Sequence, residues 1–290
     1  YEGISLMALL RFAAHFYPQR CAVIDDYQSL TYRELYTRTR QLAQILHTKY
    51  HLQPKMRVAL IGRNSLTLTI LLHALSRLGI HTTLLSTDLG TEQIRATLQK
   101  RHYQLFIYDE DLKQVPIETS CTAVTTETLS DILLSKEAQT RDIKLPKIWR
   151  GGEITIHSGG TSGNFKSIAR RPSVTSFLPP LLALLHNIRI YEYKSVLISL
   201  PFYHGFGLST LIISLLMGKK VCLQKRFDAI KTLEIIQREQ IEVMPIVPAM
   251  LSRFWQIENA KGKMKSLRCL ISGGDKLPKS LIDTTHKEIG

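Results

Sequence analysis

Three short segments place glycine, hydroxyl and basic side chains directly after an apolar run. The first covers residues 153–167 and reads Glu-Ile-Thr-Ile-His-Ser-Gly-Gly-Thr-Ser-Gly-Asn-Phe-Lys-Ser. Glycines let main-chain N–H groups point inward, hydroxyls add donors, and a lysine adds positive charge, so the segment predicts a phosphate-binding loop. Its candidate ligands are Gly160, Thr161, Ser162, Gly163 and Lys166. A flexible glycine- and serine-rich surface loop explains the same residues. The P-loop of nucleotide triphosphatases is excluded, because Phe165 stands where that motif requires glycine.

The second segment, residues 196–208, is an apolar run that ends at Pro201 and is followed by His204 between small and aromatic residues. Ligands of α/β sheets bind beyond the carboxyl ends of strands, so His204 is a candidate to orient a carboxylate or to gate a pocket. A histidine in an apolar setting also serves purely structural roles. The residues alone leave both interpretations open.

The third segment, residues 269–278, pairs Gly273 with Gly274 after another apolar run and places Pro278 shortly beyond them. Paired glycines permit a flat ring to approach the main chain closely. A tight turn before a helix that starts near the proline explains them as well.

Short apolar runs alternate with amphipathic segments along most of the chain, which predicts an α/β fold built on parallel sheets. The predicted strands are 57–61, 82–85, 105–108, 153–157, 196–200, 220–223, 242–247 and 269–272. We expect one helix to begin after Ser65 and end at Gly79, and another to begin after Asp228. Residues 130–150 have a weak period and are followed by Gly151-Gly152, so they predict a connection between two subdomains, residues 1–150 and 151–290.

Composition excludes several classes of protein. The chain has 290 residues, 44% of them hydrophobic, and four cysteines that lie far apart, which argues against a disordered protein, a disulfide scaffold and a local zinc site. No apolar run is long enough to span a membrane, and we expect a cytoplasmic protein. The net charge of +14 is compatible with nucleic acid, an anionic membrane or phosphate-bearing ligands, but the basic residues are dispersed, with no basic tail, and a solvated surface explains most of them.

Together the three segments resemble the motifs of the adenylate-forming superfamily, which includes acyl-CoA synthetases, aryl-acid ligases and adenylation domains. Residues 160–167 are similar to its Gly-Thr-Thr-Gly-x-Pro-Lys-Gly loop, with Phe165 for proline and Ser167 for glycine. Residues 201–207 are similar to its Pro-x-x-His-x-x-Gly segment, and residues 272–278 to its Gly-Gly-x-x-Leu loop. The resemblance implies layered, largely parallel sheets forming subdomains of the large N-terminal domain of such an enzyme.

The resemblance also implies the chemistry. A carboxylate attacks the α-phosphate of ATP, with Mg²⁺ present, and the acyl group of the resulting acyl-AMP then passes to CoA. The loop ending at Lys166 would hold the β- and γ-phosphates, His204 would lie by the acyl pocket, and Gly273 and Gly274 would lie beside adenine. The motifs that hold Mg²⁺ and ribose, and the small C-terminal domain, would follow Gly290. We therefore expect an N-terminal fragment that is inactive alone, with no metal site of its own.

The substrate is predicted less directly. Tyr203 and His204 stand where amino-acid adenylation domains carry an aspartate, which favours an acid without an ammonium group. A fatty acid is our prediction, because Phe202, Phe206 and Leu208 are apolar, and an aryl acid is the alternative. A second hypothesis is a non-catalytic module that binds nucleotide or acyl groups, suggested by the non-family residues Gly159, Phe165 and Ser167. Nucleic-acid binding is a third.

Overall fold

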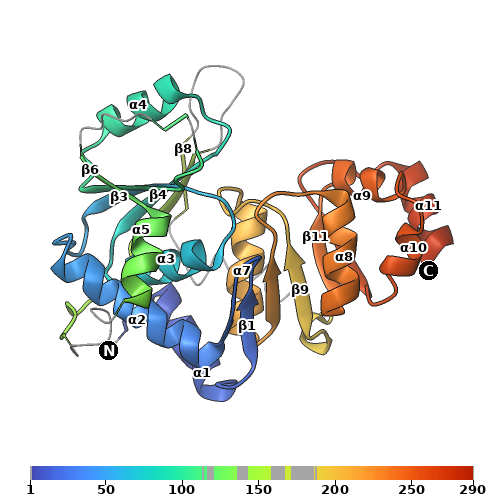
Figure 1. The fold of residues 1–290 in the computed structure, drawn as a ribbon, viewed down its shortest axis with the longest axis horizontal. Helices are drawn as coiled ribbons and strands as arrows, with labels where there is room; N and C mark the ends of the chain where they lie inside the picture. Colours follow the sequence, from blue (N-terminus) through green and yellow to red (C-terminus); the bar gives the residue numbers. More distant parts are fainter. Residues whose placement is uncertain are drawn as a thin grey trace.

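Two six-stranded sheets, both largely parallel, form the framework of the computed structural model (Figure 1). The structure describes residues 2–112, 114–115, 121–135, 143–157, 167–170, 186 and 188–289. The first sheet has the strand order β6-β5-β3-β4-β7-β8, and the second has the order β12-β11-β9-β10-β1-β2. Among the strand pairs of the described ranges, β7–β8 and β1–β2 are antiparallel and the others are parallel. The predicted α/β class with parallel sheets is therefore confirmed.

The strands of the first sheet are β3 (Arg57–Ile61), β4 (His81–Leu85), β5 (Leu105–Tyr108), β6 (Thr122–Thr125), β7 (Ile154–His157) and β8 (Ser167–Arg170). Those of the second are β1 (Cys21–Ile24), β2 (Ser29–Thr31), β9 (Ser195–Ile198), β10 (Lys220–Leu223), β11 (Val243–Ile246) and β12 (Cys269–Ser272). All eight strands predicted from sequence are present, and their ends shift by at most two residues.

The helices are α1 (Leu6–Phe16), α2 (Tyr32–Thr48), α3 (Leu66–Arg77), α4 (Thr91–Lys100), α5 (Thr126–Leu134), α7 (Gly205–Leu216), α8 (Ala229–Glu239), α9 (Pro248–Phe254), α10 (Ala260–Lys263) and α11 (Lys279–Ile289), with a 3₁₀ turn at Ile190–Glu192. Both predicted helix starts are confirmed: Ser65 accepts a hydrogen bond from the Leu68 N–H, and Asp228 accepts two. Gly79 follows α3 with a φ of +70°, as a helix-ending glycine should.

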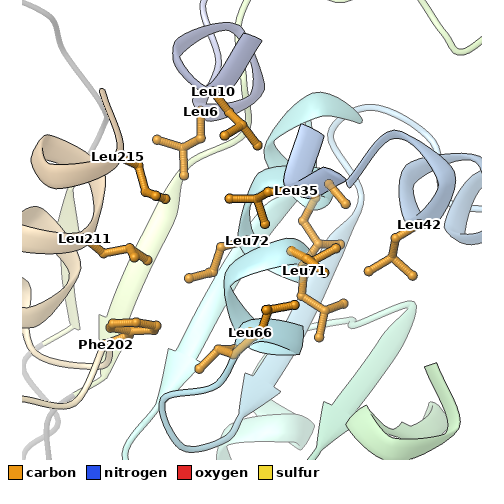
Figure 2. Close-up of a cluster of buried hydrophobic side chains, with 14 of the residues drawn as sticks. Leu6, Leu10, Leu35, Leu42, Leu66, Leu71, Leu72, Phe202, Leu211 and Leu215 are labelled. Carbon is orange, nitrogen blue, oxygen red and sulfur yellow. The ribbon is translucent and has the colours of Figure 1, made fainter. Parts of the chain in front are cut away.

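A shared core lies between the sheets and joins them. Figure 2 shows leucines of α1, α2 and α3 packed together, with Phe202, Leu211 and Leu215 of the second sheet's side facing them. On the far face of the first sheet, α4 covers a smaller cluster that includes Phe106. On the far face of the second, α8 and α9 cover another. The order of layers is thus helix, sheet, helices, sheet, helices.

The predicted connection at residues 130–150 begins within a helix. The first of them belong to α5, which Thr125 caps and Leu129 anchors in the core. Gly152 is not part of a loose linker: a Cβ atom there would lie 1.8 Å from the Ile80 carbonyl oxygen. Close packing, rather than flexibility, requires this glycine.

The two sheets do not follow the predicted division at residue 150. Strands β7 and β8 follow residue 150 but belong to the first sheet. Strands β1 and β2 precede residue 150 but belong to the second sheet. Whether residues 1–150 and 151–290 form separate subdomains stays a prediction. Within the described part of the chain, no helix is both long and apolar enough to cross a bilayer.

Candidate functional site

Three loops of interest leave the second sheet at one edge, because β9, β11 and β12 are parallel neighbours. His204 lies after β9, Val247 after β11, and Gly273 after β12. The Gly273 N–H donates to the Ile246 carbonyl oxygen at 3.1 Å, which fixes the third loop against the second. The structure therefore brings the second and third predicted segments together at the carboxyl edge, where α/β sheets bind ligands.

The turn between β9 and α7 holds His204 through its main chain. Phe202 and Tyr203 are buried, and the His204 N–H donates to the Pro201 carbonyl oxygen at 3.0 Å. His204 is the residue before the first turn of α7, and its side chain is exposed. At Gly207, a Cβ atom would lie 2.5 Å from the Pro201 oxygen and 2.6 Å from the Leu200 oxygen. The helix can approach the strand end this closely only because residue 207 is glycine.

The His204 imidazole lies beside the Tyr203 ring. Its centroid is 4.7 Å from that of the Tyr203 ring, and the two planes are inclined at 57°. Partial burial lowers the pKa of His204, and the Asp88 carboxylate opposes that shift. The side chain is therefore neutral at pH 7, with one ring nitrogen able to donate and the other able to accept a hydrogen bond. A neutral, accessible imidazole is suited to orienting a polar group of a ligand.

The two paired glycines have different surroundings. A Cβ atom on Gly273 would lie 2.8 Å from Cε1 of Phe206, so the aromatic ring already occupies that space. Gly274 has a φ of +87°, which side chains other than glycine rarely adopt. Among the described residues, a Cβ atom on Gly274 would meet only Cγ1 of Val247, at 3.4 Å. Of the pair, Gly274 has the open face that a flat ring would need.

The predicted phosphate loop, with Gly160, Thr161, Ser162, Gly163 and Lys166, lies outside the described residues. The strands on either side of it are described. His157 pairs with Ser167 across β7–β8 and with Leu85 across β7–β4. Two residues beyond Leu85, the Thr87 hydroxyl lies 3.0 Å from the Tyr203 hydroxyl. The strand ends that flank residues 158–166 are therefore at the edge that faces the His204 turn.

Sequence reasoning missed three residues at this junction: Asn64, Thr87 and Asp88. Asn64 is 3% exposed and binds main-chain atoms of the His204 turn. Each of the three follows a strand that was predicted correctly, within three residues of its last member. They could have been identified because each is a polar residue just beyond the carboxyl end of a predicted parallel strand.

Charged side chains also meet at this edge. Asp111 Oδ2 lies 2.6 Å from Arg63 Nη1 and 3.2 Å from Lys225 Nζ, which joins loops of the two sheets. Although partial burial would raise the pKa of Asp111, Lys225 and Arg63 together lower it. Burial raises the pKa of the neighbouring Asp109, whose carboxylate accepts hydrogen bonds from the Arg63 N–H and the Thr126 hydroxyl.

No metal centre is formed by the part of the chain that the structure describes, where no three histidine, cysteine or acidic side chains lie together. The four cysteines, all of them in described ranges, form no disulfide. The acidic residues of the edge are occupied by the contacts given above. These residues do not fit a Mg²⁺ site, so none is derived from them.

Comparison with known proteins gives a consistent result. A family model described as AMP-binding enzyme matches residues 10–290. The chain is 28% identical over 281 residues to a 2-succinylbenzoate–CoA ligase of Bacillus licheniformis, and 25% identical over 275 residues to one of Bacillus subtilis. These alignments cover 96% and 95% of this chain but 57% and 55% of the relatives, so the chain spans just over half of their length.

Solved structures agree on the fold. The inhibitor-bound N-terminal domain of FACL13 from Mycobacterium tuberculosis matches with a TM-score of 0.82 at 21% identity, covering 99% of this chain and 74% of that one. The o-succinylbenzoate CoA synthetase of Bacillus subtilis, in complex with its acyl-adenylate intermediate, matches with a TM-score of 0.80 at 22% identity, covering 97% and 71%. Together with the family match along nearly the whole sequence, these findings show that the chain belongs to the AMP-binding enzyme family, whose adenylate-forming members include acid–CoA ligases.

Proposed function

We propose that this chain is the nucleotide- and acid-binding part of an acid–thiol ligase, which joins a carboxylic acid to AMP and then transfers the acyl group to CoA. The observation that carries the proposal is the meeting of two strand edges at the Thr87–Tyr203 hydrogen bond of 3.0 Å. That contact brings the flanks of residues 158–166 to the side of the molecule that bears His204. A phosphate-binding loop and an acid-binding group must be neighbours for an acid to attack ATP.

Each group would have a distinct task. Thr161, Ser162, the Gly160 and Gly163 amides and Lys166 would neutralise the β- and γ-phosphates, since both the attacking carboxylate and its target are anions. His204, exposed and neutral, would hold the acid by a hydrogen bond. Gly274, with its open face, would lie against adenine, while Gly273 lets Phe206 pack beneath the same loop. ATP and CoA are substrates in this scheme. The described residues do not fit Mg²⁺, so its ligands are not assigned.

The acid that we propose is aromatic. Several relatives that match over most of this chain are 2-succinylbenzoate–CoA ligases by name, which supports an aryl acid over the fatty acid predicted from the apolar residues near His204. The apolar neighbourhood formed by Phe202, Phe206 and Leu208 accommodates a benzene ring as readily as an alkyl chain. An aliphatic acid is the alternative substrate, and the assay below includes one.

The decisive measurement is pyrophosphate release by the complete protein with ATP, Mg²⁺ and CoA. We expect release to require a carboxylic acid, and to be at least about tenfold faster with 2-succinylbenzoate or benzoate than with decanoate, a discrimination of the size that pocket shape supplies. A faster rate with decanoate would restore the fatty-acid prediction. Heat of ATP binding without any acyl-AMP would instead identify a non-catalytic binding module. Residues 1–290 assayed alone should show no turnover.

The phosphate loop has its own test. Replacing Lys166 with alanine removes the mobile positive charge, and we expect pyrophosphate release to fall by about 10²-fold, as for other single donors to a developing anion. The matched control is Lys49→Ala, which removes an equal charge from the exposed end of α2. A Lys166→Ala rate equal to that of the control would show that residues 158–166 do not hold the polyphosphate.

A further inference from the structure

Asn64 follows β3 of the first sheet, but its side chain binds main-chain atoms of the segment that follows β9 of the second sheet. Its Nδ2 donates to the Leu200 carbonyl oxygen at 2.9 Å and lies 3.5 Å from the Ile198 carbonyl oxygen. Its Oδ1 accepts a hydrogen bond from the Phe202 N–H at 3.1 Å. The side chain is 3% exposed, so no solvent replaces these bonds. One buried amide therefore satisfies polar groups on both sides of Pro201.

Asn64 is itself held firmly. The Arg63 N–H donates to Asp109 Oδ2 at 2.7 Å on one side, and Ser65 caps α3 on the other. The next residue, Leu66, donates its N–H to Asp25 Oδ2 at 2.9 Å. Successive hydrogen bonds of this kind fix both φ and ψ around position 64. The amide is consequently a rigid support, with little freedom to follow a movement of its partner.

The turn that Asn64 binds has few other anchors. Within it, Phe202 is 1% exposed and packs in the shared core. Tyr203 is 6% exposed and meets the Thr87 hydroxyl, which again comes from the first sheet. The side chain of His204 has no hydrogen bond recorded to a described residue, so its place is set by the main chain that precedes it. Contacts from the opposite sheet, together with the packing of α7 on the end of β9, determine where the imidazole lies.

We propose that Asn64 is a positioning residue for His204. It does not touch the substrates; it sets the separation between the imidazole and the first sheet's edge, from which residues 158–166 leave. The inference rests on the proposed ligase function for its kinetic consequence only. An amide is required, because the site needs a donor and an acceptor on one short side chain. Alanine would leave the Phe202 N–H and the Leu200 oxygen buried without partners, and the turn would shift to satisfy them.

The test compares Asn64→Ala and Asn64→Asp with the control Ser76→Ala in the complete protein. Ser76 is also buried, and its hydroxyl accepts a hydrogen bond from the Leu6 N–H at 3.0 Å at the opposite end of α3. The control therefore removes a comparable bond without affecting the His204 turn. Aspartate keeps the size of asparagine and its acceptor for Phe202, but loses the donor to Leu200.

Two readouts are needed. The first is the rate at which diethyl pyrocarbonate modifies His204, measured across pH by peptide mass spectrometry. We expect both Asn64 variants to raise the apparent pKa of His204 toward the ordinary histidine value, as the ring becomes more fully solvated, whereas Ser76→Ala leaves it unchanged. The second is kinetic: kcat/KM for the acid should fall by about 10- to 100-fold, the effect of misplacing a group by about 1 Å, while ATP affinity stays within about twofold.

The outcomes separate the two proposals. A wild-type protein that releases no pyrophosphate refutes the ligase function, and the modification rates still decide the role of Asn64. Unchanged His204 reactivity in both variants, or an equal change in Ser76→Ala, overturns the positioning role. If Asn64→Ala does not fold, Tyr203→Phe removes the single hydroxyl contact with Thr87. That variant should change the reactivity of His204 in the same direction, and an unchanged rate there would also count against the inference.

Discussion

His73 lies in the middle of α3 and is 2% exposed, with Nδ1 donating to the Thr69 carbonyl oxygen at 2.8 Å. Burial lowers its pKa to about 4, and the hydrogen bond to Thr69 opposes that shift only in part. The imidazole is therefore neutral in the folded protein at any pH where the enzyme would work. Its role is structural, unlike the role proposed for His204, although both histidines have similar apolar surroundings in the sequence.

This histidine makes stability depend on pH. Between about pH 6.5 and pH 4 the unfolded chain binds a proton at His73 that the folded protein does not, so the free energy of unfolding decreases as pH falls. The loss attributable to His73 between pH 7 and pH 5 is at most about 2 kcal/mol. Urea unfolding of the wild type and of His73→Leu at both pH values should show a smaller decrease in the variant. Equal decreases would mean that His73 is already charged in the fold.

At the residue scale, the sequence predicted what depends on neighbours along the chain. The caps at Ser65 and Asp228 and the glycine at position 79 follow local rules, and all three were recognisable. The bond from Asn64 to Leu200 joins residues 136 positions apart, and no local rule indicates it. Gly273 was predicted as an approach for a ring, and the ring that the structure places there belongs to Phe206 of the same chain.

Helix α7 illustrates the element scale, because its approach to β9 depends on the absence of one side chain. A Cβ atom on Gly207 would overlap two main-chain carbonyl oxygens, which cannot move independently of the strand end. Gly207→Ala should therefore lower the free energy of unfolding by about 1–3 kcal/mol, as overpacking does elsewhere. It should also displace the turn that bears His204.

The control for this prediction is Gly90→Ala at the start of α4. There the nearest described atom to a new Cβ would be 3.9 Å away, so only the preference for glycine at a helix start is lost, at most about 1 kcal/mol. Chemical denaturation of both variants gives the comparison. A Gly207→Ala protein no less stable than Gly90→Ala would contradict the packing described for α7.

Strands could be predicted where most of their residues are apolar. Strands β3, β5, β10 and β12 have the predicted bounds, since each is a run of largely apolar residues bounded by polar ones. Strands β1, β2, β6 and β8 were missed. Three of them, β2, β6 and β8, lie at sheet edges and contain at most two apolar residues each, which gives little periodicity. The glycine pair Gly151-Gly152 resembles a linker in sequence, but close packing against Ile80 requires glycine at position 152.

At the scale of the whole molecule, the shared core makes the two sheets depend on each other. Leu211 of α7 is fully buried between them. Leu211→Ala should lower stability by about 2–5 kcal/mol. If the sheets unfold together, hydrogen exchange should show equal losses of protection for β3 and β10. Leu98 of α4 packs in the cluster on the far face of the first sheet. If unfolding is cooperative, Leu98→Ala should also lower the protection of both β3 and β10. Losses confined to one sheet would show two independent units.

Strand order also could not be read from the sequence. The pattern of runs predicts parallel sheets but not which strands are neighbours, and the pairing of β1 with β10 brings together residues almost 200 positions apart, such as Val23 and Val221. The same is true of contacts in the candidate site that join the two sheets. Its local segments were recognised, whereas the edge-to-edge meeting of Thr87 with Tyr203 depends on how the sheets pack.

The same pairing has a consequence for biosynthesis. Strands β1 and β2 leave the ribosome before β10, which separates them from the rest of the second sheet and is made about 200 residues later. At about 5–20 residues per second, the N-terminal hairpin waits roughly 10–40 s with one edge unpaired while the first sheet can already assemble. During that interval the nascent chain exposes an unpaired strand edge that can pair with another chain, and protection by a chaperone would matter most then.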